Sequence, residues 1–189
     1  MEDQRVEQLK RGDPAAFEEL VREFEPKVRR TALRMLGEEQ LAWDAAQEVF
    51  LKVWNSIGRF KEESSLSTWL YRITVNVCID FQRRQTRERS RSLSMEAEEG
   101  QKALDLPSRE GIPHQEAERE EKRRILRESI AQLNEKHRTV LILRDVQGMS
   151  YSEISQIVGC SEGTMKSRLN RAREALRERL ETNGYFSDS

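Results

Sequence analysis

A stretch near the C-terminus places polar and basic side chains on one face of a predicted helix. When residues 161–180 are drawn on a helical wheel, apolar side chains gather on one side and small, polar or basic ones gather on the other. On such a face, Arg171 can donate two hydrogen bonds to guanine, and Asn170 can pair with adenine. Side chains on the flanks are better placed for phosphates, which position a helix without specifying sequence. The candidate duplex-contacting residues are Thr164, Lys166, Ser167, Arg168, Asn170 and Arg171.

The preceding segment predicts the elements that position this face. Ser150 and Glu153 have the spacing of a capping box, which begins a short helix. Gly159 ends that helix, and Ser161 can cap the longer basic helix that follows. Two helices joined by a tight turn that contains glycine are typical of a helix-turn-helix motif, whose second helix enters a major groove.

The charges on this helix also have a simpler explanation. Arg and Glu residues three or four positions apart stabilise an exposed helix without touching DNA. We expect Arg177 with Glu181, and Arg173 with Glu178, to do only this. The polar and basic side chains of residues 163–171 are the ones that we assign to DNA.

A second candidate face lies on a helix predicted over about residues 67–89. Arg72, Asn76 and Arg83 share one side of the wheel, Trp69 lies at its edge, and the polar loop "KEESSLS" precedes it. Cations follow a phosphate backbone, while an amide and an aromatic ring can hold unstacked bases, so this face suits single-stranded nucleic acid. A basic helix C-terminus favoured by the helix dipole would explain residues 83–91, but it leaves Arg72 and Asn76 unexplained.

A third stripe lies on a helix predicted over about residues 41–57. Asp44, Gln47, Glu48 and Leu51 follow one another at the spacing of a single helix face, opposite the apolar side. From spacing alone this stripe can be a protein-binding surface or simply a solvated face.

Helical periodicity runs through most of the chain, and no long apolar–polar alternation occurs. Asp13 and Pro14 predict a helix start, and Gly37 predicts its end. The acidic segment from Ser92 to Glu121 lacks periodicity and contains two of the four prolines, which is typical of a linker. The sequence therefore predicts an all-α protein with two small helical domains, an N-terminal bundle and a C-terminal helix-turn-helix bundle, joined by an acidic flexible linker.

Composition narrows the functional classes. The formal net charge is −1, and the two cysteines and two histidines are scattered without the spacing of metal ligands. We expect no metal, no small cofactor and no enzymatic activity. We find no apolar run of about 18 residues and no export leader, and so expect a cytoplasmic protein that does not insert into a membrane.

At this point the sequence resembles the extracytoplasmic-function (ECF) sigma factors, which are bacterial RNA polymerase specificity subunits. The resemblance rests on segments in a fixed order: "KRGDPAAFEELVREFEPKVRR", "DAAQEVFLKVW", "FKEESSLSTWLYRITVNVCIDFQRR" and "LNEKHRTVLILRDVQGMSYSEISQIVGCSEGTMKSRLNRAREAL". It implies sigma domain 2 over residues 1–90, a linker over 91–120, sigma domain 4 over 121–182 and a tail over 183–189. The linker would thread through the polymerase.

The resemblance also implies partners and roles. Core RNA polymerase would be bound through β and through the clamp helices of β′, promoter DNA would be recognised by both domains, and an anti-sigma factor is expected. Docking on the clamp helices falls to Asp44, Gln47 and Glu48, with Leu51 in the same stripe. The −10 element would be captured by Lys61, Ser64, Ser65, Trp69, Arg72, Asn76 and Arg83. The −35 element would be read by Lys166, Ser167, Asn170 and Arg171, beside Thr164 and Arg168.

Other classes of function are weaker alternatives. A stand-alone helix-turn-helix regulator would need a dimer interface or ligand pocket in residues 1–88, and no apolar stripe is left over for a dimer. An enzyme would need a nucleophile, a metal or a phosphate loop, and none is recognisable. A helical adaptor would leave residues 161–173 unexplained.

Overall fold

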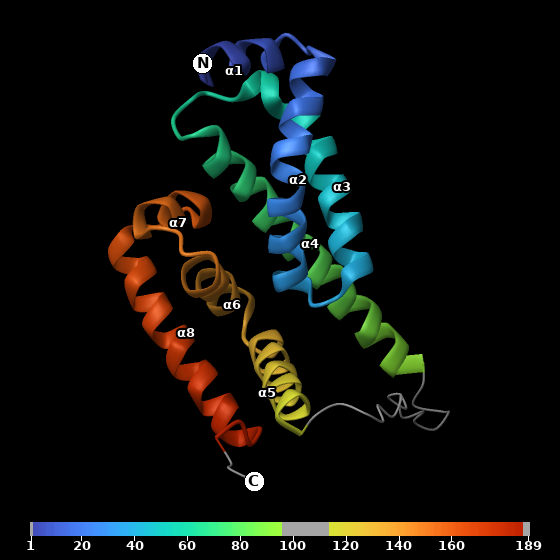
Figure 1. Ribbon diagram of the computed structural model, residues 1–189, viewed down its shortest axis with the longest axis vertical. Coiled ribbons are helices and arrows are strands. Elements are labelled where there is room, and N and C mark those ends of the chain that lie inside the picture. Colours follow the sequence, from blue (N-terminus) through green and yellow to red (C-terminus); the bar gives the residue numbers. More distant parts are fainter. Residues whose placement is uncertain (1, 96–113, 187–189) are drawn as a thin grey trace.

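The computed structural model describes residues 2–95 and 114–186, and these residues form helices and connecting loops without a β-strand (Figure 1). The prediction of an all-α protein is confirmed. The central part of the predicted linker, residues 96–113, and the last three residues of the predicted tail lie outside the described residues.

The N-terminal domain is a bundle of three long helices. Helices α2 (Pro14–Leu36), α3 (Glu39–Ser56) and α4 (Leu66–Met95) pack against one another, while α1 (Glu2–Lys10) and the 3-10 turn η1 (Ile57–Arg59) meet across one end (Figure 1). The apolar side chains at three- and four-residue spacing turn inward, as the sequence pattern predicts. The fully buried ones include Leu20, Val28, Val49, Val53, Leu70 and Val77.

The ends of α2 follow from local chemistry. The Asp13 side chain accepts hydrogen bonds from the backbone N–H groups of Ala15 and Ala16, at 2.9 and 3.4 Å. Gly37 ends the helix with a φ of 79°, a backbone conformation that residues with a side chain rarely adopt. Its N–H donates to the Leu33 carbonyl at 2.8 Å. Both predicted ends of this helix are confirmed.

The C-terminal domain contains the helices α5 (His114–Ala131), α6 (Glu135–Leu141), α7 (Tyr151–Val158) and α8 (Glu162–Thr182), with a π-helical turn, η3 (Ile142–Val146), after α6. Helix α8 packs against α5, α6 and α7. Side chains of all these elements are buried in the core of this domain, and the largest fully buried ones are Ile142, Leu143, Ile154, Met165 and Leu169.

Local caps fix the helix-turn-helix geometry. The Ser150 N–H donates to the Glu153 carboxylate at 2.8 Å, and the Glu153 N–H donates to the Ser150 hydroxyl at 3.2 Å, which completes the predicted capping box. Gly159, with a φ of 66°, ends α7. Ser161 then caps α8 by accepting from the Thr164 N–H at 3.2 Å. The start, turn and cap predicted from the sequence are all confirmed.

The two domains lie against each other. Helix α7 contacts α4, and the buried apolar residues of both domains join in one connected cluster (Figure 1). The Gln147 side chain donates to the Thr31 hydroxyl at 2.9 Å, and Arg34 donates to the Val146 carbonyl at 3.3 Å. Arg83 on α4 donates from Nε and Nη2 to the Glu135 carboxylate, at 3.0 and 3.1 Å.

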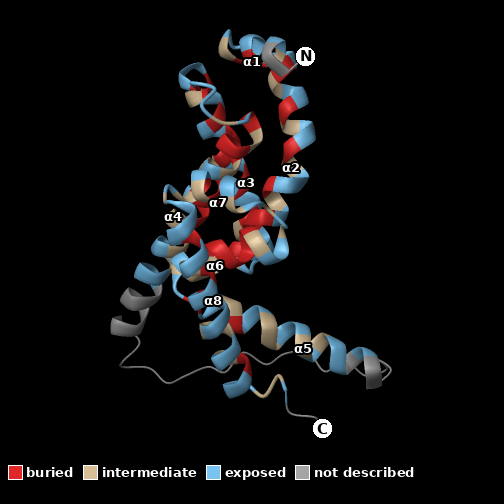
Figure 2. Ribbon diagram, turned by 90° about the vertical axis from the view of Figure 1, so that its left-hand side faces the viewer, coloured by how far each residue is buried: buried red, intermediate tan, exposed pale blue. Residues whose placement is uncertain are grey.

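The helices extend further into the predicted linker than its boundaries allowed. Helix α4 continues to Met95, past the predicted end near residue 89, and α5 begins at His114, before the predicted domain start at residue 121. Helix α5 is mostly exposed (Figure 2), so it has little apolar periodicity for a sequence reading to detect. Ion pairs of Arg124 with Glu121 and Glu128 support this exposed helix instead.

The described helices include none with the length and apolar character of a membrane span. The cysteines are unpaired: Cys78 is fully buried, and burial raises the pKa of its thiol to about 12, while Cys160 is half-buried. A thiol with so high a pKa behaves as a small apolar core residue, as expected for Cys78.

Candidate functional sites

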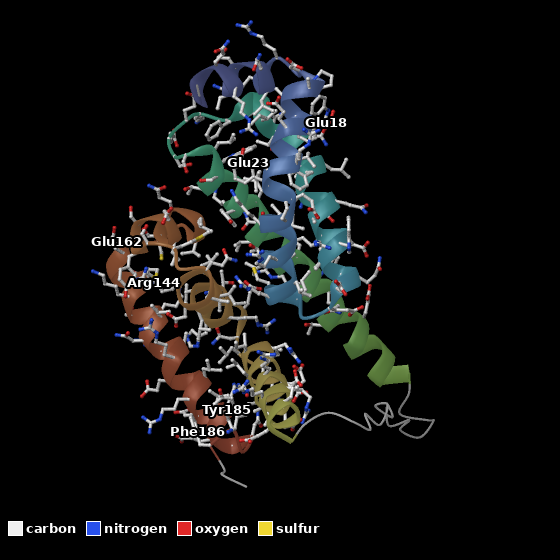
Figure 3. The ribbon with its side chains drawn as sticks, in the orientation of Figure 1. Glu18, Glu23, Arg144, Glu162, Tyr185 and Phe186 are labelled. Carbon is white, nitrogen blue, oxygen red and sulfur yellow. The ribbon has the colours of Figure 1, made fainter. Side chains whose placement is uncertain are left out.

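The predicted duplex-contacting residues lie on the N-terminal half of α8. Asn170 and Arg171 are exposed, and within the described ranges neither side chain has a hydrogen bond or an ion pair. Arg168 is half-buried beside them. Figure 3 shows Glu162 at the start of α8 and Tyr185 and Phe186 beyond its far end, and the polar face over residues 163–171 occupies the half of the helix that follows Glu162. Unpaired, exposed donors at that end can reach the base edges of a duplex.

The smaller side chains on this face already have local partners. The Thr164 hydroxyl lies 2.9 Å from the Ser161 hydroxyl, and the Ser167 hydroxyl donates to the Thr164 carbonyl at 2.9 Å. The Lys166 ammonium lies 5.3 Å from the centre of the Tyr151 ring, within cation–π distance. These contacts orient the N-terminal turns of α8, and Asn170 and Arg171 are among the side chains there without a hydrogen bond or ion pair in the described residues.

One of the two expected helix-stabilising pairs is wrong. Arg177 pairs with Glu181 at 2.8 Å, as predicted. Arg173, however, donates to the carboxylate of Asp145 at 2.9 Å and not to Glu178. Asp145 lies in the π turn that follows α6, a position that helical spacing along α8 could not indicate. Arg173 therefore ties α8 to the rest of its domain.

A cavity of about 500 Å³ lies between α8 and the first turn of α6. One wall is built from four of the predicted residues, Thr164, Ser167, Arg168 and Arg171. The other wall was missed by the sequence analysis and consists of Asn134, Glu135, Lys136 and His137. The "NEKH" stretch resembles any capped helix start, so only its spatial position beside α8 identifies it as part of this site.

The predicted single-strand face contains a second cavity, of about 440 Å³. It brings together the predicted residues Lys61, Ser64, Trp69 and Arg72. Glu63, from the predicted "KEESSLS" loop, also lines it, and the lining residues that the sequence pattern did not indicate are Arg59, Phe60, Thr68 and, from α7 of the other domain, Gln156. The mixture of cations, hydroxyls and aromatic rings suits a nucleobase with its phosphate.

Trp69 differs from the prediction of a ring at the edge of an exposed stripe. Only 8% of the residue is exposed, and its ring packs at 5.2 Å from that of Phe60. The indole is a core residue whose remaining exposed surface forms part of the cavity wall. Position on the helical wheel could not indicate this burial, because Phe60, which precedes the loop before α4, packs on the Trp69 ring.

The loop before α4 is held by contacts at both ends. Ser65 does not line the cavity; its hydroxyl accepts from the Thr68 N–H at 3.1 Å, near the start of α4. Glu62 has a φ of 60°, which is unusual for a residue with a side chain, and its carboxylate pairs with Lys10 of α1. Helix α1 therefore helps to fix the loop that forms one side of the cavity.

The rest of the predicted strand-binding stripe lies further along α4 and outside the cavity. Asn76 is exposed. Arg83 is exposed over more than half of its side chain, yet its guanidinium is occupied by the carboxylate of Glu135. The structure thus brings Arg72 to the cavity and assigns Arg83 to a contact between the domains.

The stripe on α3 lies on the outer face of that helix. Asp44 and Gln47 are exposed, and Leu51 is 63% exposed, the most exposed large apolar side chain of the N-terminal domain. Glu48 is only partly exposed and pairs with Lys52 at 3.0 Å. The Asp44 carboxylate accepts from the Gln40 amide at 3.4 Å and has no ion pair in the described chain, so the stripe presents a carboxylate, an amide and an apolar side chain facing outward.

An apolar cavity of about 420 Å³ runs beside this stripe, between α2 and α3. Gln47 and Leu51 belong to its lining, and the sequence analysis missed the others, Phe17, Val21, Glu25, Ala46, Phe50 and Trp54. The Trp54 ring is 41% exposed and packs edge-on against Phe17 at 4.8 Å. Exposed apolar side chains grouped in a groove are typical of a protein-binding surface.

Comparison with known proteins places these features in a family. The chain matches the family described as Sigma-70 region 2 over residues 20–88 and the family described as Sigma-70, region 4 over residues 123–176. The RNA polymerase sigma-H factor of Pseudomonas aeruginosa is 36% identical, over 94% of this chain and 93% of that protein. The ECF RNA polymerase sigma factor SigW of Bacillus subtilis is 33% identical, over 93% of this chain and 95% of that protein.

Two solved structures share the fold. CnrH, determined in complex with the cytosolic domain of CnrY, superposes with a TM-score of 0.67 over 96% of this chain and 97% of that chain, at 22% identity. The sigma factor RpoE of Bartonella quintana, determined in complex with the anti-sigma factor NepR, superposes with a TM-score of 0.59 over 87% of this chain and 96% of that chain, at 26% identity.

Proposed function

Because the chain belongs to the ECF sigma factors, we propose that it binds core RNA polymerase and directs it to promoters by dividing recognition between its two domains. The C-terminal domain reads the −35 element as duplex, and the N-terminal domain captures the −10 element as an opening strand. The observation that carries this proposal is the exposed pair Asn170 and Arg171, which lack partners in the described chain and lie in the N-terminal half of a capped second helix.

The N-terminal domain supplies the strand-binding part of the proposal. A cavity with Lys61, Arg72 and the aromatic pair Phe60 and Trp69 can hold a base while cations contact its phosphate. Asn76 lies one helical turn beyond Arg72 on α4, where it can contact the same strand. No covalent chemistry is needed for this role, and we propose that the protein is not an enzyme.

The outer face of α3 is proposed to dock on the clamp helices of the polymerase β′ subunit. Asp44 and Gln47 offer polar contacts, and Leu51 with Trp54 offers an apolar anchor in the adjoining groove. Apolar and aromatic anchors in a groove commonly supply most of the binding energy of an interface. Since a polymerase-binding factor works beside the chromosome, we propose a cytoplasmic location. An anti-sigma factor that competes for these faces is a further proposed partner, supported by the complex of the Bartonella relative.

The low net charge of the chain is consistent with promoter recognition that is divided between two domains. A chain of net charge −1 gains little from counterion release over its whole surface, so duplex binding without polymerase should be weak and sensitive to salt. Polymerase would hold both domains at a fixed separation, and each bound element would then raise the effective concentration of the other. Basic side chains gathered on one short face provide local recognition without general affinity for DNA.

Run-off transcription with purified core polymerase, followed by sequencing of the promoters selected, tests the proposed function. We expect the chain to confer start sites that core polymerase alone does not use. Binding to a palindromic operator as a dimer, with no effect on polymerase, would instead indicate a stand-alone regulator.

A variant of the docking face tests the α3 assignment. Replacing Leu51 by Asp puts a charge into the apolar groove, and we expect core-polymerase binding to weaken at least thirtyfold, since buried apolar anchors commonly contribute about 2 kcal/mol or more. Asp44→Ala should weaken it by a smaller factor. Both residues are exposed, so the thermal unfolding of the free chain should stay within about 0.5 kcal/mol of the wild type. Arg22→Ala, on α2 and outside the groove lining, is the control, because this exposed arginine pairs with Glu18 on its own helix; equal binding by all three variants would remove the docking assignment.

A further inference from the structure

The proposed duplex site has a wall that does not belong to the helix-turn-helix motif. The cavity beside α8 is closed on its second side by residues 134–137, at the first turn of α6. Among these, His137 is one of only two histidines in the chain, and its ring faces the same space as Arg168 and Arg171.

The Asn134 side chain fixes the state of the His137 ring. The Asn134 carbonyl oxygen accepts from the His137 backbone N–H at 2.9 Å, which caps α6. This contact leaves the Asn134 amide nitrogen next to the ring, where it lies 3.1 Å from His137 Nδ1. Because an amide NH₂ group can only donate, Nδ1 must accept, and the ring proton of neutral His137 sits on Nε2.

The charges around the ring favour this neutral form. Burial, together with the guanidinium groups of Arg168 and Arg171, lowers the pKa of His137 below its ordinary value. Lys136 on the same turn adds a further cation, and the carboxylate of Glu135 is engaged by Arg83. In the free chain near neutral pH, His137 is therefore an uncharged Nε2–H donor beside two cations.

We propose that His137 is a further DNA-contacting residue, which donates from Nε2 to a backbone phosphate of the duplex seated against α8. The inference rests on the proposed reading of duplex by α8. It assigns to α6 a contact that positions the duplex and does not specify its sequence. A phosphate at this place also offsets the positive charges of Arg168 and Arg171, which line the same cavity.

The same geometry predicts that DNA binding and ring protonation are linked. A bound phosphate favours the charged imidazolium and offsets the effect of Arg168 and Arg171, so the pKa of His137 must rise when duplex binds. By linkage, duplex affinity then increases as the pH falls from above the pKa of the complex to below that of the free chain. An increase in duplex affinity at acidic pH distinguishes this contact from one made by an arginine or a lysine, because those side chains stay charged over the whole pH range.

The test measures binding of the full chain to a fluorescent duplex that carries the selected −35 element, at low ionic strength and at pH 6 and pH 8. We expect His137→Ala to bind about two- to tenfold more weakly than wild type at pH 8, the loss of one hydrogen bond, and to lack the tightening at pH 6. His137→Gln keeps a neutral donor, so it should bind close to wild type at pH 8 but also lack the tightening. His114→Gln, which removes the other histidine, should behave as wild type.

Outcomes of this test separate the inference from the function on which it rests. NMR titration of the two histidine rings, with and without duplex, should show a rise in the pKa of His137 alone. Wild-type affinity and pH dependence in His137→Ala, beside clear weakening in Arg171→Ala, would overturn the role of His137 and leave duplex reading intact. If the wild-type chain bound no duplex even at low salt, and its polymerase complex ignored the −35 sequence, duplex reading itself would be wrong.

Discussion

The two proposed DNA-binding faces differ in their accessibility. The duplex face on α8 is exposed, and its base-reading candidates, Asn170 and Arg171, have no partners in the described residues. The strand face on α4 lies under the other domain: Gln156 of α7 lines its cavity, and Glu135 occupies Arg83. The carboxylate of Glu135 thus occupies the guanidinium that we propose to contact a phosphate of the −10 strand. A chain in this arrangement presents one promoter-reading face and covers part of the other.

The contacts between the two domains, which cover part of the strand face, are of several kinds. They include the exposed Arg83–Glu135 pair, the Gln147–Thr31 and Arg34–Val146 hydrogen bonds and the packing of α7 on α4. Exposed ion pairs contribute at most about 1 kcal/mol each. The packing of α7 on α4 belongs to the connected apolar cluster, so a partner that holds the two domains apart must compensate mainly for this apolar contact.

The largest effect is expected from a variant that weakens the duplex face on α8 and leaves the strand face on α4 intact. Arg171→Ala should weaken the promoter complex by about 1–3 kcal/mol and relax the preference at one −35 position, because a two-hydrogen-bond contact to guanine is lost. Binding of the −10 strand should stay unchanged, which a single-stranded oligonucleotide with the polymerase complex measures. Arg177→Ala is the matched control, since that arginine only pairs with Glu181 on the same helix. Equal loss at both elements would contradict independent faces.

A smaller effect is expected from the cap of α7, the helix that lies against α4. Ser150→Ala removes the capping box and should lower the free energy of unfolding by about 1 kcal/mol, as measured by chemical denaturation. Ser155→Ala is the control, because its hydroxyl bonds only to the Ser152 carbonyl within the helix. A loss no greater than that of the control would show that α7 does not depend on its cap.

The pH dependence of the same variant has a definite sign. Hydrogen bonds from the Ser150 side chain and backbone N–H lower the pKa of Glu153 below its ordinary value of 4.5. A carboxylate with a lowered pKa in the folded state stabilises the protein above that ordinary value and loses this effect as the pH falls through the lowered pKa. The difference in stability between wild type and Ser150→Ala should therefore be complete at neutral pH and shrink in acid. A difference that grew in acid would exclude the Glu153 carboxylate as its source.

The two faces also differ in how far the sequence predicted them. Short-range signals sufficed for the α8 side of the duplex face, since caps at Ser150 and Ser161 and one helical wheel determine what α8 exposes, but they did not indicate its second wall at residues 134–137. The strand face depends on packing between distant segments. Burial of Trp69 under Phe60, the entry of Gln156 and the pairing of Arg83 with Glu135 join residues that no local spacing relates. The exposed start of α5 was missed for a different reason: its first turns have no buried side and so leave no apolar period.

The smallest effect is expected from a variant of the Arg83–Glu135 pair, which covers part of the strand face on α4. Glu135→Gln removes the charge that holds Arg83, and the freed guanidinium can then bind a phosphate. We expect the free chain to bind a −10 oligonucleotide up to about fivefold more tightly, in line with an exposed ion pair of at most about 1 kcal/mol. Glu178→Gln changes the net charge equally on an exposed part of α8 and controls for long-range electrostatics. In the polymerase complex the gain should disappear, since the domains are then held apart; a gain that persisted there would mean that Glu135 repels DNA directly and does not act by holding Arg83.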